Sequence, residues 1–337
     1  MADTMEDVIM ESQDIEQETP PEDIFMAPSI NKSHILSGKS YAHYSPIPKD
    51  ISDDMATECV LGVDEAGRGP VLGPMVYALF YLPLPLHHSL LAETHHFDDS
   101  KVLTPVVRST LMEKLCTADT DLYRSCGWAT KTMSARDISS GMLRPAGMYN
   151  LNAQAMDATI ELIKEVFARG VNVKEIYIDT IGNPMTYQNK LERIFPTAQI
   201  TVAKKADSLY PCVSAASVCA KVTRDAALDV CYEAVIKDAN GDKATEGWGS
   251  GYPSDARCSN WLKQNMDPVF GWGTECRFSW STAKDLLESK DAPLKADWPV
   301  EDEDYGMKMT DYFTAGQGEE GDELVNWYGR KVSEEVF

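Results

Sequence analysis

The sequence predicts an α/β domain built on a mixed central sheet with helices on its faces. Two apolar segments, 59–64 and 71–83, flank a glycine-rich turn in the pattern of a β-hairpin. From residue 104 onwards, helical and strand-like segments alternate, which is typical of helices packed on a sheet. Three of the strands lead into acidic residues, so these acids are expected to converge on one edge of the sheet.

Each expected strand is a short run rich in β-branched, aliphatic or aromatic residues. The first two are expected to be antiparallel neighbours, and the last two each lead into an acid. The five runs are 59–64, 71–83, 122–133, 173–179 and 199–204.

The expected helices are marked by caps and by apolar spacing, and they cover 104–116, 150–169, 211–237 and 254–266. Thr104 and Pro105 supply an N-cap and a proline at the first helical position of the first helix. Gly170 is a natural stop for the second helix. The third is rich in alanine and valine, which predicts a long buried helix, and Ser254 is expected to cap the fourth.

Composition places the chain among ordinary globular proteins, with 337 residues, 43% hydrophobic and 25% charged. The net charge of −22 lies mainly in two acidic ends, −9 in residues 1–57 and −10 in residues 285–337. We therefore expect a disordered acidic arm over 1–57, a folded domain over 58–287, and an acidic, partner-docking tail over 288–337. Because the middle is close to neutral, the charge does not exclude a nucleic-acid substrate.

The cysteines and the apolar segments indicate the compartment. Eight cysteines occur without a C-x-x-C pair, which predicts free thiols in a reducing environment. No apolar run approaches the ~20 residues of a membrane helix, and the acidic N-terminus lacks the pattern of a signal peptide. A soluble intracellular protein is expected.

The segment Gly62–Pro70 carries the clearest functional pattern. A strand runs into two adjacent carboxylates, Asp64 and Glu65, and the turn Gly67–Arg68–Gly69 follows. Glycine lets a backbone approach a ligand closely, and arginine offers a planar fork suited to phosphate. This combination favours a metal-assisted reaction on a phosphodiester; a solvated strand end with the same residues is the simpler alternative.

Two further acids, Asp179 and Asp207, follow later strands in the same manner. Hydrolysis of a phosphodiester in a two-metal site needs several hard oxygen ligands around cations about 4 Å apart. Asp64, Glu65, Asp179 and Asp207 are therefore the candidate metal-ligating and catalytic carboxylates. Taken singly, each acid is more often a cap or turn residue, and only their repeated position at strand ends favours a shared site.

Six motifs follow one another within residues 58–287: Gly62–Pro70, Asp99–Lys101, Tyr177–Gly182, Lys205–Asp225, Gly249–Pro253 and Arg277–Trp280. Each motif is weak or moderate alone. The ordered set resembles the type 2 ribonuclease H family, ribonuclease HII, and in particular the catalytic subunit of its eukaryotic heterotrimeric form.

The resemblance implies an RNase H-like fold with a C-terminal helical extension, and cleavage of the RNA strand of RNA–DNA hybrids. It also implies incision on the 5′ side of a single ribonucleotide embedded in duplex DNA, with 3′-hydroxyl and 5′-phosphate products. In this family the matching acids, Asp64, Glu65, Asp179 and Asp207, would hold two divalent cations, Mg²⁺ or Mn²⁺.

Substrate-binding roles also follow from the resemblance. The Gly67–Arg68–Gly69 turn would recognise the 2′-hydroxyl, which alone separates RNA from DNA at one position, largely through backbone groups. Tyr252 would stack on the sugar of the neighbouring deoxynucleotide. Lys101 would contact a backbone phosphate, and Arg68 is a second candidate for such a contact.

Partners and location are implied in the same way. The eukaryotic family forms a heterotrimer with accessory subunits B and C and acts in the nucleus during DNA replication and repair, where it removes ribonucleotides and the RNA primers of Okazaki fragments. In the tail, Met309, Tyr312 and Phe313 partly match a sliding-clamp-binding peptide, although Gly306 stands where glutamine is usual. The same segment is alternatively a docking site for a partner subunit or a plain linker.

Two other classes of protein remain open from the sequence. A catalytically silent nucleic-acid-binding scaffold is disfavoured, because binding alone does not require four carboxylates near a polyanion. Another enzyme of RNase H-like fold, such as a DNA-processing nuclease or an integrase, is disfavoured by the Gly67–Arg68–Gly69 and Gly249–Pro253 turns.

Overall fold

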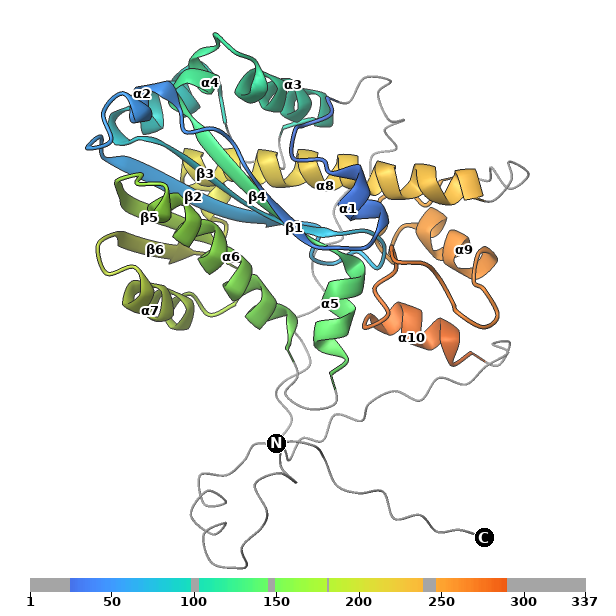
Figure 1. Ribbon diagram of the computed structural model, residues 1–337. Helices are drawn as coiled ribbons and strands as arrows, with labels where there is room; N and C mark the ends of the chain where they lie inside the picture. Colours follow the sequence, from blue (N-terminus) through green and yellow to red (C-terminus); the bar gives the residue numbers. More distant parts are fainter. Residues whose placement is uncertain (1–24, 98–102, 145–148, 181, 239–246, 290–337) are drawn as a thin grey trace, which may run out of the picture. The chain divides into compact units, whose positions relative to one another are not determined.

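The computed structural model describes residues 25–97, 103–144, 149–180, 182–238 and 247–289. Its centre is a six-stranded mixed sheet in the order β1-β4-β3-β2-β5-β6 (Figure 1). The β1, β4, β3 and β2 strands pair antiparallel, whereas β2, β5 and β6 pair parallel. The strands are β1 (Tyr41–Tyr44), β2 (Cys59–Ala66), β3 (Met75–Pro83), β4 (Gly127–Met133), β5 (Val173–Asp179) and β6 (Gln199–Ala203). The predicted mixed sheet is confirmed.

Helices cover both faces of this sheet. They are α1 (Lys32–Leu36), α2 (Lys49–Ser52), α3 (Pro105–Cys116), α4 (Asp121–Ser125), α5 (Ala135–Met142), α6 (Leu151–Ala168), α7 (Pro184–Ile194), α8 (Pro211–Asp238), α9 (Ala256–Gln264) and α10 (Ser281–Leu287). Short 3₁₀ helices occur at Leu84–Leu86 and at Ala206–Ser208, the latter labelled η3, and a π-helix covers Ser89–Thr94.

Successive side chains of each strand point to opposite faces of the sheet and form one hydrophobic core on each face. In the central strand β3, Phe80 and Leu82 pack with α3 and α8 on one face, while Leu79 and Tyr81 pack with α6 on the other. Figure 1 shows α8 and α6 on opposite sides of the sheet. Burial on both faces explains why β3 is an almost continuous apolar run rather than an alternating one.

Among the element boundaries that differ from the sequence prediction, three have a clear local cause. Strand β3 begins at Met75 rather than residue 71, because Gly73 has a φ of +85° and breaks the extended run. The predicted strand 122–133 starts with helix α4, since the Thr120 side chain accepts a hydrogen bond from the Tyr123 N–H and caps a helical turn. Helix α9 is capped by Asp255, one residue after the predicted Ser254.

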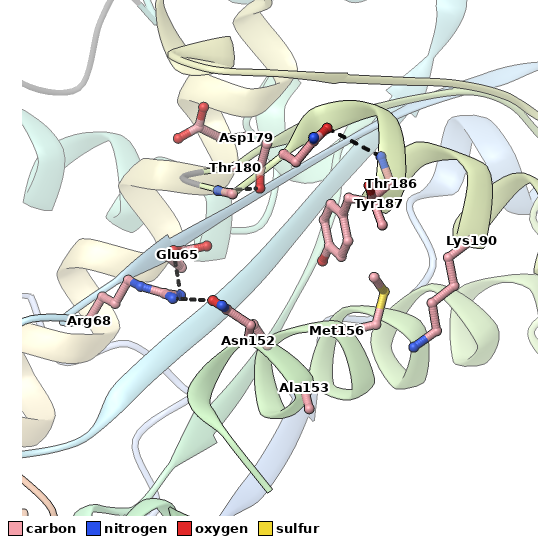
Figure 2. A pocket seen from close by; sticks show the side chains of 13 residues that line it. Glu65, Arg68, Asn152, Ala153, Met156, Asp179, Thr180, Thr186, Tyr187 and Lys190 are labelled. Atoms are coloured by element: carbon pink, nitrogen blue, oxygen red, sulfur yellow. Dashed lines mark hydrogen bonds and ion pairs between the residues drawn. The ribbon is translucent and has the colours of Figure 1, made fainter. Parts of the chain in front are cut away.

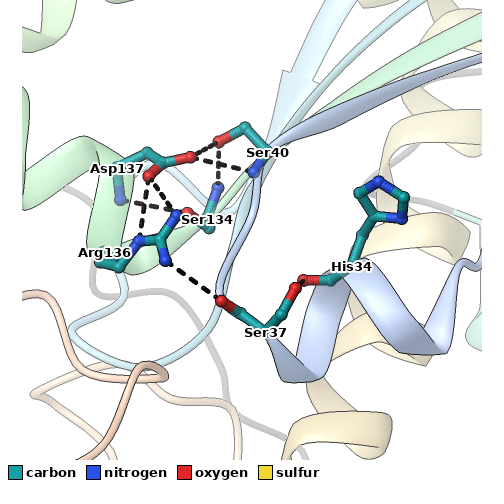
Figure 3. Close-up of polar contacts among 6 residues, drawn as sticks. All are labelled: His34, Ser37, Ser40, Ser134, Arg136 and Asp137. Atoms are coloured by element: carbon teal, nitrogen blue, oxygen red, sulfur yellow. Dashed lines mark hydrogen bonds and ion pairs between the residues drawn. The ribbon is translucent and has the colours of Figure 1, made fainter.

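The prediction of a disordered arm over 1–57 is wrong for residues 25–57. This stretch forms α1, β1 and α2, buries Ile35 and Ile51, and adds β1 to the edge of the sheet. Figure 3 shows the hydrogen bonds that hold the middle of this stretch against α5. The Asp137 carboxylate accepts them from the Ser40 N–H at 2.9 Å and from the Ser40 hydroxyl at 2.7 Å. Residues 1–24 lie outside the described residues.

A third, smaller core supports the C-terminal part of the domain. Val71 and Leu72 pack there with three buried tryptophans and with residues of α8, α9 and α10. This is the predicted C-terminal helical extension. All eight cysteines are free thiols. Within the described ranges, no helix combines the length and apolar character needed to cross a bilayer.

The sheet and α8 approach each other closely at Gly62 in β2. A Cβ atom built there would lie 2.4 Å from both the carbonyl carbon and the carbonyl oxygen of Cys212 in the first turn of α8. Real Cβ atoms do not approach backbone this closely, so α8 can rest on β2 only because residue 62 has no side chain.

We predict that Gly62→Ala lowers the free energy of unfolding by about 1–3 kcal/mol, because overpacking forces α8 away from β2. Urea unfolding followed by circular dichroism measures this. Gly182→Ala is the matched control, since the nearest atom to its added Cβ would be 3.8 Å away. Equal losses in the two variants would contradict the close contact.

We also predict that Asp137→Ala loosens residues 37–45 and costs about 1–2 kcal/mol, because the two hydrogen bonds to Ser40 are lost. Limited proteolysis locates the loosened segment, and urea unfolding gives the free energy. Ser140→Ala, at an exposed position of the same helix, should leave both unchanged. Unaltered proteolysis of the Asp137 variant would refute this role.

Candidate active site

The first pair of candidate carboxylates ends strand β2. Successive side chains of a strand point to opposite faces, so Asp64 faces α8 and Glu65 faces the α6 side. Asp64 is only 6% exposed, and its carboxylate accepts the Glu65 N–H at 2.7 Å and a hydrogen bond from Ser217 on α8. Both acids are thus held by core elements rather than by a loose loop.

The second pair lies on neighbouring segments. Strand β5 runs parallel to β2 with Ile178 opposite Val63, which brings Asp179 beside Asp64. The Asp179 carboxylate accepts the N–H of Ala206 at 2.8 Å, and this bond joins the end of β5 to η3. Asp207, the next residue of η3, is also buried. The ends of β2 and β5 and the η3 turn therefore meet at one edge of the sheet, as predicted.

Electrostatic repulsion marks this edge as a place for a cation. Burial, together with the charges of Glu65 and Asp179, raises the pKa of Asp64 well above its ordinary value. Burial and the Asp179 charge also raise the pKa of Glu65 to about 7, although Arg68 acts in the opposite direction. Buried carboxylates that repel one another are stabilised when a divalent cation binds between them.

The donor set suits Mg²⁺ or Mn²⁺, because it consists of carboxylate oxygens without thiolate or imidazole. Throughout the described part of the chain, no three His, Cys, Asp or Glu side chains already stand in position to hold a metal ion. The chemistry of these carboxylates, although not their positions in this structure, therefore fits divalent cations.

A cleft of about 390 Å³ opens beside the carboxylates, between β2, α6 and α7 (Figure 2). Glu65 and Asp179 line it, whereas Asp64 and Asp207 are not among its lining residues. The Arg68 guanidinium lies 3.5 Å from the Glu65 carboxylate and donates a hydrogen bond to the Asn152 side chain. Arg68 thus connects the predicted recognition turn to a candidate metal ligand.

Sequence reasoning missed the far wall of this cleft. Besides Asn152 on α6, it is formed by Asn183, Tyr187 and Lys190 of the α7 segment. Positions 183, 187 and 190 are spaced by four and three residues, so they share one face of a helix. That spacing, directly after a strand-end acid, is the signal from which they could have been found.

The Gly67–Arg68–Gly69 turn requires its glycines. Gly67 has a φ of +77°, and a Cβ there would lie 2.8 Å from the carbonyl oxygen of Pro74. At Gly69, an added Cβ would lie 3.0 Å from the ring of Tyr252. The structure therefore brings Tyr252 against the turn, although the two are far apart in the sequence.

The Tyr252 turn is itself firmly attached. The N–H groups of Val71 and Leu72 both donate to the carbonyl of Gly251, at 2.9 and 3.2 Å. Arg224 of α8 donates to the Ser250 carbonyl and lies over the Tyr252 ring, 5.8 Å from its centroid. These contacts fix the tyrosine ring, 38% exposed, at the surface beside Gly69.

The remaining predicted site residues are not placed. Lys101 lies outside the described residues, as do Met309, Tyr312 and Phe313 of the proposed clamp-binding segment. Their roles remain predictions.

Together, the mixed sheet, the strand-end carboxylates and the adjacent glycine turn define a metal-assisted phosphodiester hydrolase of α/β fold. The chain matches the ribonuclease HII family over residues 61–283. It is 58% identical to the A subunit of ribonuclease H2 from Neurospora crassa, over 96% of this chain and 99% of that protein. To the A subunit of human ribonuclease H2 it is 43% identical, over 80% of this chain and 85% of that one.

A solved structure supports the same assignment. The ribonuclease HII of Archaeoglobus fulgidus, solved in complex with PCNA, superimposes with a TM-score of 0.53 and 26% sequence identity over 70% of this chain and 100% of its own. The chain belongs to the ribonuclease HII family. It is an endoribonuclease of the ribonuclease H type, which cleaves RNA in RNA–DNA hybrids.

We predict that Tyr252→Phe keeps most of the cleavage at a single embedded ribonucleotide, because its ring still packs on Gly69. Tyr252→Ala should lose about 10- to 100-fold in kcat/KM, the size of one lost stacking contact. Tyr123→Ala, at an equally exposed tyrosine of α4, is the control and should cleave normally. Equal rates for the two Tyr252 variants would remove the stacking role.

Proposed function

We propose that this endoribonuclease incises the 5′ side of single ribonucleotides embedded in duplex DNA, in addition to cleaving RNA–DNA hybrids. In this proposal the products carry 3′-hydroxyl and 5′-phosphate ends. The observation that carries it is the position of the Gly67–Arg68–Gly69 turn, one residue after the strand that presents Asp64 and Glu65. A group that selects ribose therefore lies next to the groups that act on its phosphate.

Asp64, Glu65, Asp179 and Asp207 are the residues that would hold two divalent cations, Mg²⁺ or Mn²⁺. When bound, such cations supply an activated water and stabilise the leaving oxygen of the phosphodiester. The protein's part is to position the four carboxylates on two core strands and the η3 turn, so that little reorganisation is needed during reaction. Asp64 and Asp207 are buried, whereas Glu65 and Asp179 are partly exposed.

The other residues of the site act on the substrate. Backbone groups of the Gly67–Arg68–Gly69 turn would meet the 2′-hydroxyl, because without Cβ atoms they can approach a ribose closely. Tyr252 would stack on the neighbouring deoxyribose, and Lys101 would contact a phosphate. Arg68 would balance the charge of Glu65 and lie toward the phosphate backbone.

Partners and location complete the proposal. The similarity to the A subunit of ribonuclease H2 supports a heterotrimer with accessory subunits B and C, acting in the nucleus on ribonucleotides and RNA primers in replicated DNA. The archaeal relative was solved with PCNA, which supports a sliding clamp as a partner for Met309, Tyr312 and Phe313.

The test is cleavage of a DNA duplex that contains one ribonucleotide, by the chain co-expressed with its accessory subunits, with Mg²⁺ and with chelator. We expect metal-dependent incision 5′ of the ribonucleotide and no cleavage of all-DNA duplex. Asp179→Asn should lose at least about 10³-fold in kcat while it retains substrate binding, because one metal ligand is lost.

Asp285→Asn, which removes an exposed carboxylate on α10, is the matched control and should cleave normally. Full activity of the Asp179 variant would refute the carboxylate assignment. Cleavage of all-DNA duplex would indicate a generic nuclease, and absence of incision by the whole complex would refute the proposed substrate.

A further inference from the structure

The three carbonyl groups of the Gly67–Arg68–Gly69 turn are all bound by the C-terminal extension. Arg277 donates to the Gly67 carbonyl at 2.6 Å and to the Arg68 carbonyl at 2.9 Å. The indole N–H of Trp280 donates to the Gly69 carbonyl at 3.0 Å. Two side chains, separated by more than 200 residues from the turn, thus take every acceptor that its backbone offers on that side.

Arg277 and Trp280 form one unit. The guanidinium lies over the Trp280 ring, 4.8 Å from its centroid, which is a favourable cation–π distance. Arg277 is fully buried and also donates to the Gly73 carbonyl at 3.0 Å, while its own N–H donates to the Val71 carbonyl at 2.8 Å. The unit is therefore rigidly joined to both ends of the glycine turn.

This arrangement determines where the N–H groups of the turn point. In a trans peptide the C=O and N–H directions are opposed. Because the carbonyls of Gly67 and Arg68 face Arg277, the N–H groups of Arg68 and Gly69 face away from it. Within the described residues neither N–H donates to another protein group, so both remain available to a ligand. Residue 70 is proline and contributes no N–H.

We propose that Trp280, supported by Arg277, is a positioning residue for ribonucleotide selection. It acts through the Gly69 carbonyl, fixing the turn so that the Arg68 and Gly69 N–H groups meet a single 2′-hydroxyl. The inference rests on the proposed role of this turn. Trp280 also controls Tyr252 indirectly, because the tyrosine ring packs on Gly69 and must follow its position.

The proposal distinguishes two substrates. In a uniform RNA–DNA hybrid every nucleotide of one strand offers a 2′-hydroxyl, so the contact at the turn is one of several that identify the strand as RNA. A duplex with one embedded ribonucleotide offers a single hydroxyl at a fixed position, and there a displaced turn loses its contact. Loss of the Trp280 hydrogen bond should therefore weaken cleavage of the second substrate more than that of the first.

The experiment compares Trp280→Phe with Trp272→Phe in the complex with its accessory subunits. Phenylalanine keeps an aromatic ring but lacks the indole N–H. Trp272 is a matched control, since it lies in the same C-terminal core and donates to the Leu262 carbonyl at 2.9 Å, away from the turn. For each protein, kcat/KM is measured on the uniform hybrid and on the single-ribonucleotide duplex.

We expect Trp280→Phe to lower the ratio of single-ribonucleotide to hybrid kcat/KM about tenfold, the effect of one hydrogen bond. Trp272→Phe should leave this ratio unchanged, even if it lowers the thermal midpoint. Arg277→Lys is the second variant: it keeps the charge but cannot bind two carbonyls in the fixed geometry of guanidinium, so the ratio should fall here too.

Thermal unfolding shows whether each variant folds. If either Trp280→Phe or Arg277→Lys does not fold, the kcat/KM ratio of the remaining variant tests the proposal. A folded variant with the wild-type ratio would overturn the positioning role, as would an equal fall for Trp272→Phe. If the wild-type complex fails to incise the single ribonucleotide at all, the proposed function fails instead, so the two failures are distinguishable.

Discussion

The sheet edge that carries the candidate carboxylates depends on one steric constraint, the direct contact between the backbone of β2 at Gly62 and the first turn of α8. Because no side chain separates them, α8 begins against the strand that carries Asp64 two residues later. The η3 turn, which immediately precedes α8, is thereby brought to the end of β5, where its Ala206 N–H binds the Asp179 carboxylate. The same placement of η3 determines the position of Asp207. The absence of a side chain at Gly62 thus sets the spacing between β2 and α8. That spacing determines whether acids from three segments can lie close together.

The repulsion within this site is sustained by the core around it. Raised pKa values at Asp64 and Glu65 show that burial and neighbouring charges disfavour the ionised forms. The fold tolerates this arrangement because β2 and β5 are central strands whose apolar side chains pack on both faces. A loop carrying the same acids would relax away from them. Rigid strands hold the acids together. A cation that binds between them relieves their mutual repulsion, and this relief favours its binding.

Local signals explain what the sequence revealed. Strand 173–179 was predicted with its observed bounds, and the four candidate acids were chosen from their positions at or near strand ends, where their catalytic role stays a prediction. What escaped prediction depends on distant partners. Strand β1 is a polar edge strand, ordered by pairing with β4 and by the contact of Ser40 with Asp137, 97 residues away. The bonds from Arg277 to the glycine turn span about 210 residues. No periodicity or cap signals such contacts, because they exist only once the sheet and the C-terminal core have formed.

Arg68 links the glycine turn to the candidate carboxylates. Its carbonyl is bound by Arg277, while its side chain lies 3.5 Å from Glu65 and hydrogen-bonds Asn152 across the cleft. A shift of the turn therefore moves a positive charge relative to a candidate metal ligand, only three residues away. The charge of Arg68 lowers the pKa of Glu65, against the effect of burial, and so favours the ionised form that a cation requires. Under the proposed roles of the turn and the carboxylates, correct positioning of the turn is thus also a condition for ionisation of Glu65, and three residues of backbone would couple selection of the sugar to cleavage of its phosphate.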